Sequence, residues 1–207
     1  MIAEQCHGIV LSTLAYGDND VVVSLFTLEH GRLRAFARSA RTSRKRFAGA
    51  LEPATHLALM MKIKPEGLCS LERAEQLAPP PGLASRLDAL ALALYGCELV
   101  EQLTPEGQPL PRLYRLLSTM LEYLATAAAG QEIRRFFEIN LLNILGYRPP
   151  LEEPLLTPLR ACLATGRFSA VPFSAPQLEA AGRLLDRELE RHCPRSRRSL
   201  EFLEGVI

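Results

Sequence analysis

The chain has 207 residues, 48% of them hydrophobic and 23% charged, which suits one or two globular domains and excludes a disordered or fibrous protein. No stretch approaches the roughly 20 apolar residues that span a bilayer, and the N-terminus has no features of a secretory signal, so we expect a cytoplasmic protein. The net charge is only +1 and the five cysteines are widely spaced, so composition indicates neither a strongly charged partner nor a disulfide framework.

The N-terminal part of the chain carries the short hydrophobic patterns of β-strands. The alternation is clearest in the third strand, where Leu33, Ala35 and Ala37 are expected to face inward. A polar linker is expected at residues 39–49. Five short strands with one long connection predict a small closed barrel; an OB-type barrel fits this count, although counting does not separate it from an SH3-like barrel. The predicted strands are residues 8–14, 21–27, 32–38, 55–63 and 68–71.

The spacing of the hydrophobic residues changes once along the sequence, and this change divides the chain into two parts. The Pro-Pro-Pro-Gly sequence at 79–82 predicts a boundary between a barrel domain, residues 1–78, and a second domain, residues 79–207. The second domain has helical hydrophobic spacing and is expected to be an all-α bundle, so the fold class is α+β with two domains. About five helices are predicted, at residues 83–103, 111–129, 131–145, 177–192 and 195–203, with one further short helix near 156–164 in a Pro-rich region.

Motifs for catalysis or metal binding are absent from the sequence. It contains no P-loop, GxGxxG, HExxH or GxSxG pattern, and its four histidines stand singly rather than at metal-ligand spacing. The paired acids Asp18 and Asp20 belong to a turn sequence. We therefore expect a non-enzymatic protein with no cofactor and no bound metal.

A basic segment is the most informative feature. Between residues 32 and 46 the chain has seven basic residues and no acidic one. Three of these arginines share a strand face with Phe36, which combines phosphate contacts with a ring on which a base can stack. A solvated charged face is the ordinary alternative for such a run. We expect a nucleic-acid-binding surface whose candidate residues are Arg32, Arg34, Phe36, Arg38, Arg41, Arg44, Lys45, Arg46, Lys62 and Lys64.

Two other functions remain open on these residues alone. The barrel of an interaction adaptor would use the same arginines to bind an acidic protein partner, and an RNA-binding OB protein would use them to bind RNA.

A second basic pair, Arg134 and Arg135, precedes Phe136 and Phe137. This pair could form the rim of a pocket for an acidic peptide tail, although core packing of both rings is the commoner arrangement.

Several segments resemble the RecO family of bacterial DNA repair and recombination mediators. The resemblance runs in order along nearly the whole chain, and its N-terminal part is the most specific. The segments that carry it are residues 8–11, 16–18, 25–27, 30–34, 37–41, 46–53, 144–149 and 195–200.

The resemblance implies an N-terminal OB-fold and a helical domain, with residues 32–46 as the DNA face. It implies a nucleoid-associated protein that binds single- and double-stranded DNA and anneals complementary strands. The implied partners are RecR, the C-terminal tail of the single-strand-binding protein, and the RecA pathway, in which the family helps RecA to replace that protein on DNA.

The sequence departs from the family pattern in one place. Many members have a four-cysteine zinc site after the segment that ends at residue 149, whereas residues 151–158 contain no cysteine and Cys162 is the only sulfur nearby. We expect no zinc here, and expect the loop at 149–176 to keep its shape through prolines and the packing of Leu and Phe.

Overall fold

The computed structural model describes residues 2–47, 49–64, 67–77, 83 and 85–207. They belong to two compact units, residues 1–80 with 97–114 and residues 81–96 with 115–207. The first unit therefore includes residues 97–114 in addition to the predicted barrel domain. The predicted boundary sequence at 79–82 lies outside the described residues. Within the described part of the chain, no helix is both long and apolar enough to span a membrane.

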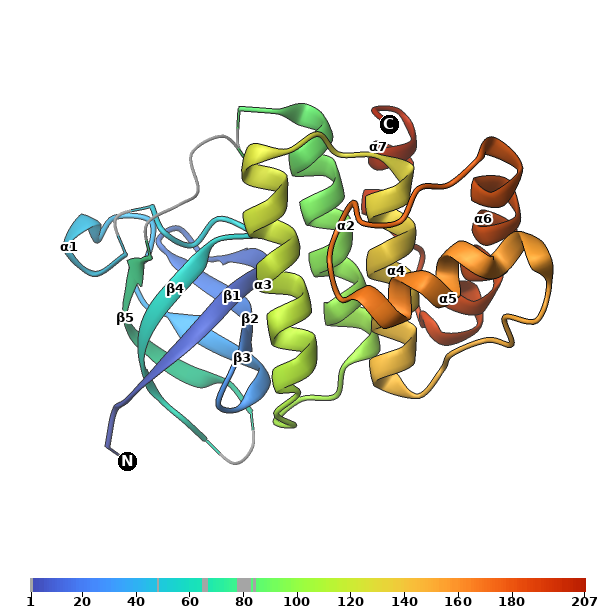
Figure 1. The fold of residues 1–207 in the computed structure, drawn as a ribbon. Coiled ribbons are helices and arrows are strands. Elements are labelled where there is room, and N and C mark those ends of the chain that lie inside the picture. Colours follow the sequence, from blue (N-terminus) through green and yellow to red (C-terminus); the bar gives the residue numbers. More distant parts are fainter. Residues whose placement is uncertain (1, 48, 65–66, 78–82, 84) are drawn as a thin grey trace. The chain divides into compact units, whose positions relative to one another are not determined.

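Five strands of the first unit form a closed barrel in the order β1-β2-β3-β5-β4 (Figure 1). Strands β3 and β5 pair in parallel, whereas the other pairs are antiparallel, and β1 closes the barrel by pairing with both β2 and β4. The closed five-stranded barrel predicted from the strand count is confirmed, and it is of the expected OB type. The strands are β1 (Glu4–Tyr16), β2 (Asp20–Thr27), β3 (Gly31–Ala37), β4 (His56–Lys62) and β5 (Cys69–Gln76).

The barrel core follows the predicted alternation in β3, since Leu33, Ala35 and Ala37 are all buried. The fifth strand was predicted to end at residue 71, but β5 continues to Gln76. A register shift opposite Met60 and Met61 leaves Glu72 as an extra residue in β5. This bulge interrupts the alternation of inward-facing and outward-facing side chains on which the strand prediction depended.

The connection between β3 and β4 was predicted as a polar linker, but it contains the one-turn helix α1 (Arg44–Phe47). Phe47 and Ala50 are buried and belong to the same hydrophobic cluster as the barrel core. The two apolar side chains therefore anchor a segment whose sequence is otherwise basic and polar.

A second connection, residues 104–110, lies against the start of β3. The backbone N–H of Gly107 donates to the carbonyl oxygen of Arg32 at 2.8 Å. Gly31 has a φ of +69°, and a Cβ at this position would lie 1.9 Å from the carbonyl oxygen of Gln108. Only glycine fits here, because the backbone needs a positive φ and the two chains approach too closely for a side chain.

The remaining elements are helical, as predicted, although the bounds differ slightly. The first of these helices begins at Leu87 rather than at residue 83, and Leu87 is 58% exposed at this helix end. The Pro-rich region contains a short 3₁₀ helix followed by α5. The helices are α2 (Leu87–Leu103), α3 (Pro111–Thr126), α4 (Gln131–Leu145), η1 (Pro154–Leu156), α5 (Thr157–Thr165), α6 (Ala175–His192) and α7 (Arg198–Glu204).

A buried ion cluster lies inside the second unit. Arg134 and Arg135, from α4, are buried and contact the buried carboxylate of Glu138 at 2.9 and 2.7 Å. Asp186 of α6 lies 2.8 Å from Arg134 and 3.1 Å from Arg135, and Tyr95 donates its hydroxyl hydrogen to Glu138 at 2.6 Å. The two guanidinium groups are thus occupied inside the fold and do not form the rim of a peptide pocket.

Candidate nucleic-acid interface

The outer face of β3 carries three of the predicted site residues, and a fourth follows the strand directly. The burial pattern of β3 alternates, so that Arg32, Arg34 and Phe36 are more exposed than the residues between them, and the exposed Arg38 follows directly. The Arg34 side chain is 54% exposed and that of Arg32 only 17%. Arg32, Arg34 and Phe36 share a face of β3 as predicted, whereas Arg38 lies just beyond the end of the strand, and the four residues differ in how accessible they are to a ligand.

Arg32 is held within the barrel unit. Its Nε donates to the carbonyl oxygen of Thr104 at 2.9 Å, and its Nη1 lies 3.1 Å from Glu106. Arg34 Nε lies 2.9 Å from the same carboxylate. The basic run therefore has an acidic counterpart, which comes from the connection between α2 and α3 and is not visible in the local sequence.

Two residues of the basic loop after β3 contribute to its conformation. Arg41 Nη1 donates to the carbonyl oxygen of Asp18 at 3.2 Å, and Arg46 Nη2 donates to that of Arg38 at 2.7 Å. The guanidinium of Arg46 also lies 5.0 Å from the centre of the Phe47 ring. These contacts hold the loop while leaving Arg41 exposed.

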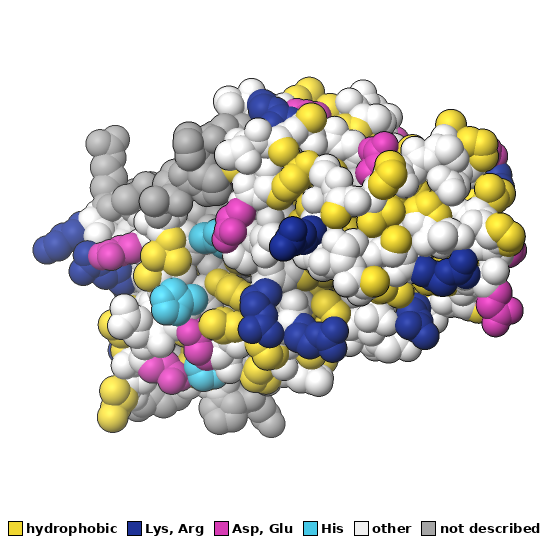
Figure 2. All heavy atoms as spheres, in the orientation of Figure 1, with side chains coloured by type: hydrophobic (Ala, Val, Ile, Leu, Met, Phe, Trp, Pro, Cys, Tyr) yellow, Lys and Arg dark blue, Asp and Glu magenta, His cyan; other side chains and the backbone are white. Residues whose placement is uncertain are grey.

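The remaining cations of the loop have fewer contacts. Arg38 and Lys45 are exposed and form no ion pair among the described residues. The backbone of Arg44 lies in α1, but its side chain is outside the described part of the structure. Lys and Arg side chains gather at the α1 end of the barrel unit (Figure 2).

Of the two predicted lysines, Lys62 is the last residue of β4 and Lys64 follows it; β4 pairs with β1 and β5 rather than with β3. Lys64 is exposed, whereas Lys62 lies 3.2 Å from Glu72 of β5. Hydrogen bonds from Ser70 and Lys62 lower the pKa of the Glu72 carboxyl, so this pair is charged at neutral pH. Lys62 is thus partly neutralised by its neighbour.

Tyr16 is an aromatic residue that the site prediction missed. Its ring packs edge-to-face against Phe36, with 5.7 Å between the ring centroids, and its side chain is 61% exposed. The sequence pattern placed Tyr16 in a turn, but β1 continues through it and pairs it with Asp20. Sequence periodicity could not have revealed it, because a register shift between Val10 and Ser12 changes the face on which Tyr16 lies.

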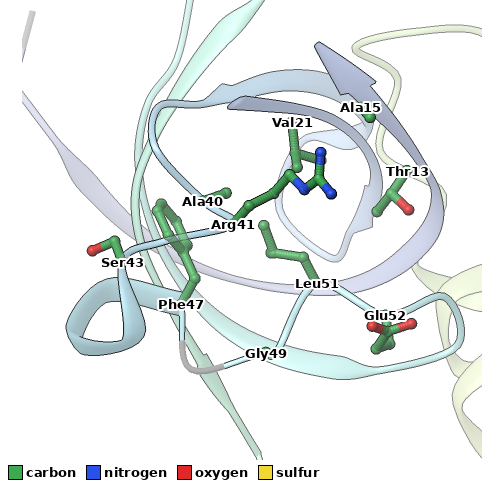
Figure 3. Close-up of a pocket in the computed structure, with 10 residues that line it drawn as sticks. All are labelled: Thr13, Ala15, Val21, Ala40, Arg41, Ser43, Phe47, Gly49, Leu51 and Glu52. Carbon is green, nitrogen blue, oxygen red and sulfur yellow. The ribbon is translucent and has the colours of Figure 1, made fainter. Parts of the chain in front are cut away.

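A pocket of about 390 Å³ lies at one end of the barrel unit, beside the basic loop (Figure 3). Its wall contains both polar and apolar side chains, and those of Val21, Arg41 and Leu51 converge in it. The sequence analysis identified one of its lining residues, Arg41. The lining residues are Thr13, Ala15, Val21, Ala40, Arg41, Ser43, Phe47, Gly49, Leu51 and Glu52.

The described part of the chain has few of the features that mark a catalytic centre. Burial raises the pKa of the thiols of Cys6, Cys97 and Cys162 to about 12, which makes these cysteines poor nucleophiles at neutral pH. The described residues contain no group of three His, Cys, Asp or Glu side chains that could hold a metal ion. What the barrel unit does present is a surface of cations and aromatic rings.

Comparison with known proteins agrees with this architecture. Residues 1–80 match the family model described as Recombination protein O N terminal, and residues 84–157 match Recombination protein O C terminal. The chain belongs to the RecO family. The basic segment and Tyr16 thus lie within the N-terminal RecO region, and the buried ion pairs of α4 lie within the C-terminal one.

Two curated RecO relatives match this chain over nearly their full length. The protein named DNA repair protein RecO from Pelobacter propionicus is 43% identical, covering 100% of this chain and 98% of the relative. The protein of the same name from Geobacter sulfurreducens is 38% identical, covering 98% of each. The first alignment spans 241 positions for a chain of 207 residues, so that RecO relative has segments that this chain lacks.

Proposed function

We propose that this RecO-family chain is a non-enzymatic DNA repair and recombination mediator that binds single- and double-stranded DNA through its barrel. The observation that carries the proposal is the outer face of β3 with the loop that follows it. There the exposed cations Arg34, Arg38, Arg41 and Lys45 lie in the same segment as Phe36, whose ring packs against that of the exposed Tyr16. Single-strand-binding OB-folds combine the same two elements, a positive groove and stacking rings.

The candidate residues take different roles in this proposal. Arg34, Arg38, Lys45 and the basic residues near them contact phosphates, and Phe36 stacks on bases. Arg32 mainly fixes the 104–110 connection, since its guanidinium is largely buried and bonded to Thr104. Binding of this kind depends on displaced counterions and weakens steeply as salt rises.

Strand annealing follows from the same charges. Two complementary strands that are both neutralised by arginines repel each other less, and they pair faster when held on one surface. The relatives are named DNA repair proteins, and the family resemblance supports RecR and the C-terminal tail of the single-strand-binding protein as partners. In this role the protein assists RecA loading at the nucleoid, in the cytoplasm, and needs no cofactor.

A charge-removal experiment tests the proposal. The variant with Arg34, Arg38 and Lys45 all replaced by Ala should lose most DNA binding and annealing of complementary oligonucleotides. A matched control replaces Arg183, Arg187 and Arg191, exposed on α6, and changes the net charge equally. If both variants bind DNA as the wild type does, the barrel face is not the DNA site, and an acidic protein partner becomes the better assignment for its arginines.

A further inference from the structure

The end of β1 exposes apolar side chains that the barrel does not need for its own core. Leu14 is 67% exposed and Tyr16 is 61% exposed, and both are on the outer face of the sheet. Val22 and Phe36 lie next to them across the strands, because Leu14 pairs with Val22 and Val22 pairs with Phe36. An exposed contiguous apolar patch on a small domain is a common mark of an interaction site.

A β-bulge in β1 produces this exposure. The register of β1 against β2 shifts between Val10 and Ser12, which leaves Leu11 as an extra residue. Val10 is opposite Leu25 in the core, whereas Leu14 is opposite Val22 on the outside. Without the bulge, the alternation that buries Val10 would also turn Leu14 and Tyr16 inward.

We propose that Leu14, Tyr16, Val22 and Phe36 form a stacking platform for the faces of unpaired bases, and that this platform makes the barrel prefer single-stranded to double-stranded DNA. The inference rests on the proposed DNA-binding function and assigns its substrate class. Rings and aliphatic side chains can cover a base face only where that face is not already stacked in a duplex, whereas phosphates are available in both.

Charge complementarity favours a nucleic acid as the occupant of the stacking platform. Arg34 stands two residues before Phe36 on the same face of β3, roughly 6.6 Å along the strand, and the exposed Arg38 follows directly after the end of β3. A base stacked on Phe36 would therefore have cations nearby in sequence for its own phosphates. The nearby carboxylate of Asp20 already accepts a hydrogen bond from the backbone N–H of Ser39 at 2.7 Å.

The two rings of the stacking platform are arranged so that both can contribute to base stacking. Tyr16 and Phe36 meet at an interplanar angle of 82°, which makes a corner rather than a flat stack. Tyr16 is the more exposed of the two and comes from the end of β1 next to the β1–β2 turn. In OB-folds the loop between the first two strands borders the oligonucleotide-binding face.

The test compares an unstructured single-stranded DNA oligomer with a duplex of the same length, by fluorescence anisotropy at one salt concentration. Tyr16→Ala and Phe36→Ala should each weaken single-strand binding about tenfold. Duplex affinity should stay within about twofold, because the phosphate contacts remain. Tyr16→Phe should keep the wild-type preference, and Phe202→Ala, which removes a partly exposed ring from α7, is the control.

A second readout reports stacking directly. The chain contains no tryptophan, so Tyr16→Trp introduces a single tryptophan, whose emission can be excited selectively, at an exposed position. Its emission should be quenched by the single strand, in step with the anisotropy, and far less by the duplex. Wild-type affinity for both DNAs in Tyr16→Ala and Phe36→Ala, with no quenching in Tyr16→Trp, would overturn the stacking platform but leave the proposed function in place. Absence of DNA binding by the wild type would overturn both.

Discussion

The carboxylate of Glu106 lies 2.9 Å from Nε of Arg34, on the face of the barrel that carries the candidate DNA contacts. The same oxygen lies 3.1 Å from Arg32, so one acid faces two of the arginines in the basic segment. An anionic group in this position competes with a phosphate for both guanidinium groups. Glu106 should therefore reduce the affinity of this surface for DNA.

Glu106→Gln should strengthen DNA binding. Removing one negative charge frees Arg34 for a phosphate, so we expect affinity for single-stranded DNA to rise by about two- to fivefold at low salt, with a slope of log affinity against log salt steeper by up to about one. Anisotropy titrations at several salt concentrations measure both quantities. Glu179→Gln, on the exposed surface of α6, is the matched control and should change neither. Unchanged or weaker binding in Glu106→Gln would argue against Arg34 as a phosphate contact.

Arg32 and Arg34 should separate into a structural and a binding residue. Arg32→Ala removes hydrogen bonds from the Thr104 carbonyl and from Glu106, and should lower the free energy of unfolding by about 1–3 kcal/mol. Arg34→Ala should cost little stability and weaken DNA binding instead. Urea unfolding and anisotropy, measured on both variants, give the comparison. Equal effects of the two substitutions on both measurements would contradict this division.

Gly31→Ala should destabilise the barrel unit more than Gly17→Ala does. Both glycines have positive φ, but only at Gly31 does a Cβ meet backbone, at 1.9 Å from the Gln108 oxygen. We expect a loss of about 1 kcal/mol for Gly17→Ala from the left-handed backbone alone. Gly31→Ala should lose about 3 kcal/mol or more, because the 104–110 connection must also move. Chemical denaturation of the two variants tests the difference, and equal losses would mean that the connection moves freely.

Glu138→Gln should destabilise the helical unit by about 3–5 kcal/mol, because it leaves the charges of Arg134 and Arg135 without their buried counterion. Burial alone would raise the pKa of Glu138, but the charges of Arg135 and Arg134 outweigh it and hold the pKa below its ordinary value. A carboxyl whose pKa is lowered by folding stabilises the protein above its unfolded-state pKa. This contribution is lost as the pH falls through the folded-state pKa.

The pH dependence of the free energy of unfolding therefore distinguishes wild type from Glu138→Gln. Wild-type stability should decline as the solution is acidified below the ordinary carboxyl pKa, and the variant should decline less over the same range. Glu179→Gln, exposed on α6, serves as the control and should follow the wild type. Identical pH profiles for Glu138→Gln and wild type would show that Glu138 is not ionised in the folded protein.

The sequence predicted those parts of the fold that depend on local periodicity. Leu33, Ala35 and Ala37 alternate with charged or aromatic residues, and this pattern placed both the core side and the outer side of β3 correctly. Gly146, with a φ of +83°, marks the end of α4 at the predicted residue. Such features are encoded within a few residues of each other, so no tertiary information is needed.

What the sequence could not show depends on bulges and on distant partners. The bulge at Leu11 has no local signature, so the strand pattern gave no reason to turn Tyr16 toward the candidate site. Glu106 reaches Arg34 only because the 104–110 connection lies against β3. Arg134 and Arg135 look like surface residues in sequence, and only the fold places Glu138 and Asp186 beside them.

The most direct test of DNA binding by this protein is the affinity of the wild type for a labelled, unstructured single-stranded DNA oligomer, measured by fluorescence anisotropy at low and at moderate salt. We predict tight binding at low salt that weakens steeply as salt rises, since several phosphates are neutralised by arginines and lysines. Absence of binding at low salt, or binding that salt leaves unchanged, would contradict the proposal that the barrel face is a DNA-binding surface.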